Sequence, residues 1–99
     1  MHDPHDLMRQ ATTLLFGEPS ARQLARALGP LHPDGPRDQV DDRLVRRWAA
    51  GHRDIPAWAL SGMAVLLDRD RLEMEAECRE MSATSSKLRV AADFLITYP

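Results

Sequence analysis

The sequence predicts an all-α fold, a small helical bundle followed by a C-terminal helical extension. Apolar residues recur at three- and four-residue spacing along several segments, which is the period of an amphipathic helix. Glycine and proline separate these segments, and no segment alternates apolar and polar residues as a half-buried strand does. The 99 residues are enough for one compact domain, which we expect over residues 1–67, with residues 68–99 as the extension.

Two short helices are expected in the first third of the chain. Asp6 can cap the first, and Gly17 ends it. The second covers residues 20–28, and Gly29 stands where a helix commonly ends. Residues 30–39 contain three prolines and a glycine, so we expect a loop there.

Two further helices follow this loop. The third covers residues 41–50, with Asp41 as its N-cap and Gly51 after its end, and the fourth has Pro56 in its first turn. Trp48 is expected in the core, and Trp58 to be partly exposed. On the third helix, Leu44 or Val45 is expected to be buried with Trp48. The other expected apolar contacts are Leu7, Leu14, Leu15, Leu24, Ala25, Leu28, Leu60, Met63, Ala64, Leu66 and Leu67.

The extension carries a heptad-like series that indicates a coiled-coil seam. Its members alternate in spacing between four and three: Leu60, Ala64, Leu67, Arg71, Met74, Cys78, Met81, Ser85, Leu88, Ala92 and Leu95. The weak helix formers from Ser82 to Ser86 predict a break, with a restart at Lys87. We expect a homodimer through Met74, Cys78, Met81, Leu88, Phe94 and Leu95. The alternative is that the last helix folds back onto its own domain.

Composition excludes several classes of protein. No apolar run approaches the length of a membrane span, and the N-terminus lacks the pattern of a signal peptide. The single cysteine, Cys78, allows no disulfide within the chain and is typical of a reducing cytoplasm. No nucleophile with its base, paired carboxylates or phosphate-binding loop indicates an enzyme or a cofactor. His2, Asp3, His5 and Asp6 have metal-ligand chemistry, but no second cluster completes a site, so we expect no metal.

The arrangement of residues around the second and third helices resembles the Cro/repressor-type helix-turn-helix family of phage and bacterial regulators. In that family a small alanine lies mid-way along the first motif helix and a glycine follows four residues later, as Ala25 and Gly29 do here. Val45 and Trp48 match the apolar pair of the recognition helix. The resemblance covers about residues 7–67, with residues 30–39 as an insertion between the motif helices.

The resemblance implies that the third helix enters the DNA major groove. Its candidate base contacts are Asp42, Arg43, Arg46 and Arg47, and arginine suits this role because its planar group can bond twice to guanine. The candidate phosphate contacts are Arg22, Gln23, His52 and Arg53. The inserted loop could add a phosphate-binding wing through His32 and Arg37, or be merely structural, which we favour.

We therefore expect a cytoplasmic, sequence-specific transcriptional regulator, a repressor that binds an inverted-repeat operator in double-stranded DNA as a homodimer. The chain carries 13 basic and 15 acidic residues, a net charge of −2, which argues against a non-specific nucleic-acid binder. Two alternatives stay open. The protein could be a DNA-binding antitoxin with a protein toxin as partner, or a protein-interaction module that uses the helix-turn-helix shape without DNA.

Overall fold

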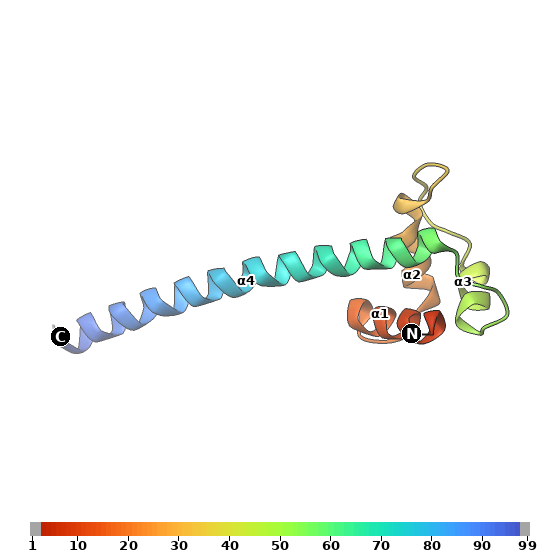
Figure 1. Ribbon diagram of the computed structural model, residues 1–99. Coiled ribbons are helices and arrows are strands. Elements are labelled where there is room, and N and C mark those ends of the chain that lie inside the picture. The colour runs from red at the N-terminus through yellow and green to blue at the C-terminus, as the bar shows by residue number, and fades with distance from the viewer. Residues whose placement is uncertain (1–2, 98–99) are drawn as a thin grey trace. The chain divides into compact units, whose positions relative to one another are not determined.

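The computed structural model describes residues 3–97, and in this range the chain forms four α-helices, one short 3₁₀ helix and no strand (Figure 1). The prediction of an all-α fold is therefore confirmed. The chain divides into two compact units, one up to Arg69 and one from Asp70 onward. The last helix, α4 (Ala57–Thr97), contributes to both units.

Helix α1 (Pro4–Phe16) begins earlier than the sequence predicts. The Asp3 carboxylate, not that of Asp6, accepts a hydrogen bond from the backbone N–H of His5 at 2.9 Å. Pro4 fits this start because the first helical position needs no N–H donor. Asp6 instead lies in the first turn and forms an exposed ion pair with Arg9 at 3.1 Å.

Helix α2 (Ala21–Leu28) and helix α3 (Asp42–Ala49) are each capped by the side chain before them. The Ser20 Oγ accepts a hydrogen bond from the N–H of Gln23 at 3.2 Å, and Asp41 Oδ1 accepts one from the N–H of Arg43 at 3.0 Å. These caps satisfy backbone donors that a helix start leaves open. They fix where each helix begins.

The segment between α2 and α3 is held against the end of α2. It begins with a 3₁₀ helix, η1 (Gly29–Leu31), where the sequence predicts a loop from residue 30. The Gly29 carbonyl accepts hydrogen bonds from the N–H groups of His32 and Arg37 at 3.2 and 3.1 Å. The N–H of Val40 donates to the Ala25 carbonyl at 2.9 Å, and Val40 is buried. The ten-residue insertion is thus anchored at both ends.

Gly29 serves packing rather than a left-handed turn. It follows the last residue of α2, as predicted, but its φ is −50°, so the helix ends without the left-handed conformation that glycine often adopts at this position. A Cβ at this position would lie 2.6 Å from the Arg37 carbonyl oxygen and 2.7 Å from the Gln39 backbone. The returning loop crosses so close to α2 that only glycine leaves room.

The core of the first unit joins all four helices. Its buried apolar residues are Met8, Ala11, Leu24, Ala25, Leu28, Val40, Val45, Trp48, Ala59 and Met63. Gly62 lets the start of α4 approach α2, because a Cβ there would lie 2.9 Å from Leu28 Cδ2. The carbonyl of Pro56, directly before α4, accepts hydrogen bonds from the first turn of that helix.

Three of the expected apolar contacts are exposed. Leu7 is 41% exposed, Leu14 is 63% exposed, and Ala64 is also exposed. All three line a surface groove whose walls also include Met63 and Leu67. The helical period places these residues on the correct side of their helices, but the groove between the helices is not closed.

The second unit consists of the C-terminal part of α4. This part is helical from Asp70 to Thr97, so the predicted break between Ser82 and Ser86 is wrong. From Arg71 to Ile96 every side chain except that of Ser85 is exposed. No helix within residues 3–97 is long and apolar enough to cross a membrane.

Candidate nucleic-acid interface

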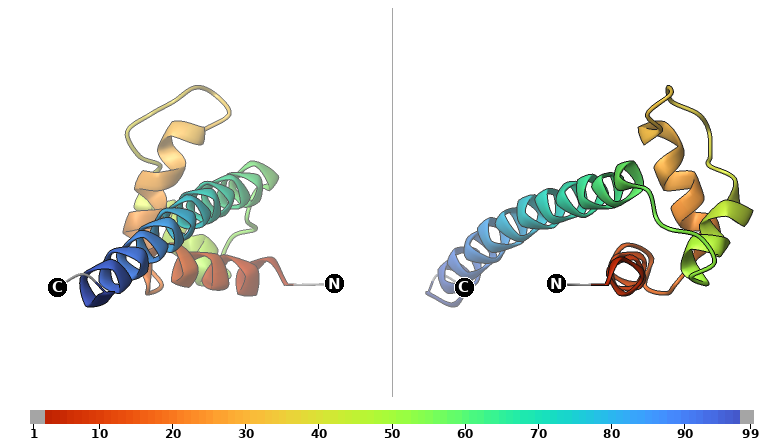
Figure 2. Two further views of the ribbon diagram at one scale, coloured as in Figure 1. Left: turned by 90° about the vertical axis from the view of Figure 1, so that its left-hand side faces the viewer. Right: turned by 45° about the vertical axis from the view of Figure 1, so that its right-hand side comes forward.

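Helix α3 is fixed in the first unit through its apolar side. Val45 is fully buried and Trp48 is 2% exposed. Helix α3 packs against α2, as the two views in Figure 2 show, and also contacts α1. On α2, Ala25 is fully buried and its carbonyl holds the backbone of Val40, just before α3. The small side chain at this point lets the chain entering α3 pass close to α2.

The side of α3 opposite Val45 and Trp48 carries three arginines. Arg43, Arg46 and Arg47 are all exposed, and Asp42 is half-buried. Because residues three and four apart lie on the same side of a helix, the three guanidinium groups share one face. The positions of Val45 and Trp48 in the core determine which face this is. Of the four candidate base-contacting residues, the three arginines therefore lie on the outer surface of a well-anchored helix, and Asp42 lies half-buried at its start.

Local acidic residues neutralise only part of this cationic face. Arg46 forms an ion pair with Asp42 at 3.3 Å, and the Asp41 carboxylate is used as the helix cap. Within residues 3–97, the side chains of Arg43 and Arg47 form no hydrogen bond or ion pair. An exposed pair such as Arg46–Asp42 contributes little and exchanges readily for another partner. The guanidinium groups of Arg43 and Arg47 are thus available to a ligand. That of Arg46 becomes available when its weak ion pair with Asp42 opens.

The candidate phosphate contacts lie at two helix ends. Arg22 and Gln23 are exposed in the first turn of α2. His52 and Arg53 are exposed directly after α3, where Gly51 adopts a left-handed φ of 78° and the N–H of His52 donates to the Arg47 carbonyl at 3.0 Å. The turn at Gly51 and the hydrogen bond from His52 to Arg47 hold the backbone that carries the His52 and Arg53 side chains.

The inserted loop does not offer His32 as a phosphate contact. The His32 ring is mostly buried and lies 4.9 Å from the ring of Trp58, and its Nδ1 accepts a hydrogen bond from the N–H of Asp34. Trp58 in turn meets Trp48 edge to face at 6.1 Å. Arg37 is exposed, yet its backbone anchors the loop on Gly29. These contacts make His32 part of the packing around Trp58.

The metal-ligating residue types and the single cysteine were the other candidates for a functional site. Over residues 3–97, no three His, Cys, Asp or Glu side chains are grouped to hold a metal ion. His2, one of the N-terminal residues considered above, lies outside the described residues. His5 bonds to Asp3 within the helix cap, through its Nδ1 at 3.2 Å. Cys78 is an exposed free thiol on α4.

The proposed dimer residues all lie in the second unit. Met74, Met81, Leu88, Phe94 and Leu95 are between 58% and 69% exposed, and Cys78 is also exposed. Such a concentration of exposed large apolar side chains is unusual on a soluble surface and indicates an interaction site.

Comparison of this chain with protein-family models, with characterised proteins and with solved structures gave no match. The resemblance to the Cro/repressor-type family therefore remains a prediction from the residues of α2 and α3.

Proposed function

We propose that the protein is a sequence-specific DNA-binding regulator whose helix α3 enters the major groove. The observation that carries this proposal is the division of α3 into two sides. One side, Val45 and Trp48, is completely buried, and the other presents Arg43, Arg46 and Arg47 to solvent. A groove-reading helix needs this division, because it must be held rigidly by its back while its front remains free.

The chemistry of the exposed face suits base recognition better than general attraction to DNA. The guanidinium fork can donate two parallel hydrogen bonds to the O6 and N7 atoms of guanine. The chain as a whole has a net charge of −2, so electrostatic attraction to any DNA is weak. Affinity then depends on the local arginine cluster and on the fit to a particular sequence. This combination favours a regulator that discriminates between sites, and repression of a bound promoter is the simplest outcome.

The proposal is tested by selecting duplexes from a randomised DNA pool and measuring the binding of the best sequence by fluorescence anisotropy. Arg43→Ala and Arg47→Ala should each weaken binding by about tenfold or more, because each loses a base or phosphate contact. Both should keep the wild-type circular dichroism spectrum, since neither side chain packs in the core. Arg79→Ala, an exposed arginine of the second unit, is the matched control and should bind normally.

Wild-type affinity in both α3 variants would contradict the proposal. Failure to enrich any duplex would favour the protein-interaction module, in which the same arginines contact an acidic partner. An antitoxin would bind DNA as proposed and would in addition bind a protein through its C-terminal segment. Co-expression with a neighbouring toxic gene product separates that case from a simple repressor.

A further inference from the structure

The part of α4 in the second unit carries a regular alternation of large and small side chains along its heptad series. The residues reached by the three-residue steps are large and apolar: Met74, Met81, Leu88 and Leu95. The residues from which the three-residue steps start are small or polar: Arg71, Cys78, Ser85 and Ala92. Most of these side chains are exposed on the helix, so nothing within this segment covers them.

We propose that this face is covered by the same face of a second copy of the chain, running antiparallel and centred on Ala83. In this register each residue of the heptad series faces the partner residue of that series that lies equally far on the other side of Ala83. Met81 then faces the partner's Ser85, and Cys78 faces the partner's Leu88. Further out, Met74 faces the partner's Ala92, and Arg71 faces the partner's Leu95.

Packing favours the antiparallel orientation. Every layer of the seam then combines one large side chain with one small or polar one, which is how facing helices interdigitate without voids. A parallel, in-register pair would place small residues opposite small residues and leave gaps. It would also bring Arg71 against the partner's Arg71 in the seam, where two like charges repel.

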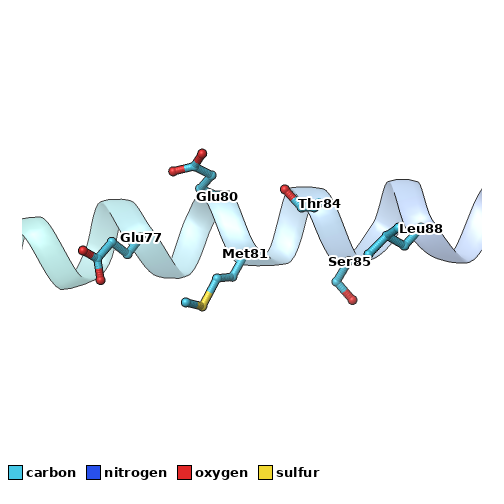
Figure 3. Close-up of a pocket in the computed structure, with 6 residues that line it drawn as sticks. All are labelled: Glu77, Glu80, Met81, Thr84, Ser85 and Leu88. Carbon is cyan, nitrogen blue, oxygen red and sulfur yellow. The ribbon is translucent and has the colours of Figure 1, made fainter.

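The depression around Ser85 shows where a large side chain would fit. Figure 3 shows that Met81 and Ser85 project to the same side of the helix, whereas Glu80 and Thr84 lie toward the other edge. These four residues line one open depression together with Glu77 and Leu88, and its short side chains are those of Thr84 and Ser85. In the proposed register the partner's Met81 packs at the Ser85 edge of this depression, and the symmetric contact forms on the other helix.

Charges beside the seam favour the same orientation. Glu75 and Arg89 each follow a large seam residue directly, and such positions lie side by side across an antiparallel pair. Glu75 is then near the partner's Arg89, and the pair occurs twice by symmetry. In a parallel pair Glu75 would instead meet the partner's Asp70, a repulsive contact. Glu75 forms an exposed ion pair with Arg71 at 3.0 Å within the chain, which is weak enough to be exchanged or shared.

Phe94 lies outside this seam, because it directly precedes Leu95 and falls on the neighbouring part of the helix surface. The proposed seam therefore keeps five of the six dimer residues that the sequence predicts.

Cross-linking through Cys78 tests the orientation in the full-length protein. Light scattering at micromolar concentration should give a dimer. Under mild oxidation the wild type should form no disulfide, because the two Cys78 residues lie about 15 Å apart along an antiparallel pair. Leu88→Cys, which retains Cys78, should give a covalent dimer whose linked peptides join Cys78 to the new cysteine. The matched control, Leu88→Cys with Cys78→Ser, should form none.

A charge exchange gives an independent test of the register. Glu75→Arg and Arg89→Glu should each raise the dimer dissociation constant about fivefold or more, and the double variant should recover most of the loss. Within one chain the two positions are about 21 Å apart, so recovery requires a contact between chains.

A monomer at micromolar concentration, a wild-type disulfide between two Cys78 residues, or additive effects of the two charge changes would each overturn the proposal. None of these measurements involves DNA, so the dimer can fail while DNA binding stands, and the reverse is also true.

Discussion

At the scale of single residues, Gly29 is the position where substitution should be most damaging for its size. The missing side chain leaves room for the Arg37 carbonyl and the Gln39 backbone, which are rigid neighbours. We predict that Gly29→Asn lowers the free energy of unfolding by about 1–3 kcal/mol or more through overpacking. Gly17→Asn is the matched control, because nothing lies within 4 Å of its Cβ and asparagine tolerates its left-handed φ. Equal losses of the two variants in chemical denaturation would contradict this packing role of Gly29.

Trp48 and Arg46 lie on opposite sides of α3 and should respond oppositely to truncation. Trp48→Ala removes a large side chain that is 2% exposed, and we predict a loss of about 3–5 kcal/mol in the free energy of unfolding. Arg46→Ala removes only an exposed ion pair, so its stability should stay within about 0.5 kcal/mol of the wild type. Thermal or urea denaturation measures both. A loss of several kcal/mol for Arg46→Ala would contradict the assignment of the two sides.

The burial of single residues could be predicted from the sequence where a helix has only one apolar side. Val45 and Trp48 are, with the partly buried Leu44, the large apolar residues of a polar helix, so their burial was predictable, and the exposure of the arginines follows from it. Leu14 was not predictable in this way. Its place on the apolar side of α1 is correct, but its 63% exposure depends on how far α1 stands from the start of α4.

At the scale of elements, the start of α1 depends on the ionisation of Asp3. The N–H of His5 donates to this carboxylate, which lowers the pKa of Asp3 below its ordinary value of 3.8. The cap therefore contributes its full stability above pH 3.8, and loses it as the pH falls through the lower folded-state pKa. An NMR titration of the Asp3 carboxyl should give a midpoint below 3.8. A midpoint at or above that value would contradict the cap, and Asp3→Asn should abolish the matching titration of the His5 amide.

The caps of the helices were only partly predictable. Asp3 caps α1 in place of the expected Asp6, and the cap that Ser20 forms on α2 was not predicted. The Asp41 cap of α3 was predictable, because capping is a local interaction. The continuity of α4 across residues 82–86 was not, because serine and threonine each lower helix propensity by only a fraction of a kcal/mol. Extending a helix that has already formed costs less than starting a new one, so strong helix formers on both sides override the weak stretch.

At the scale of the whole molecule, the sequence predicts an all-α protein and the structure confirms it, because the helical periods and their glycine and proline boundaries are unambiguous. The path of the inserted loop was not predictable. It depends on the hydrogen bond from Val40 to the Ala25 carbonyl and on the tilted ring contact of His32 with Trp58, which join residues distant in sequence. The candidate interface on α3 was predicted residue by residue from the helix-turn-helix pattern, and its function stays a prediction.

The central claim, that α3 reads a DNA sequence, is tested most directly by the ratio of two dissociation constants. Fluorescence anisotropy should be recorded for the wild-type protein with its selected duplex and with a scrambled duplex of equal composition, at two salt concentrations. We predict a preference of about 10³-fold or more for the selected duplex that persists at the higher salt. Equal affinities that fall steeply together with salt would reveal phosphate contacts alone, and would contradict sequence-specific reading by α3.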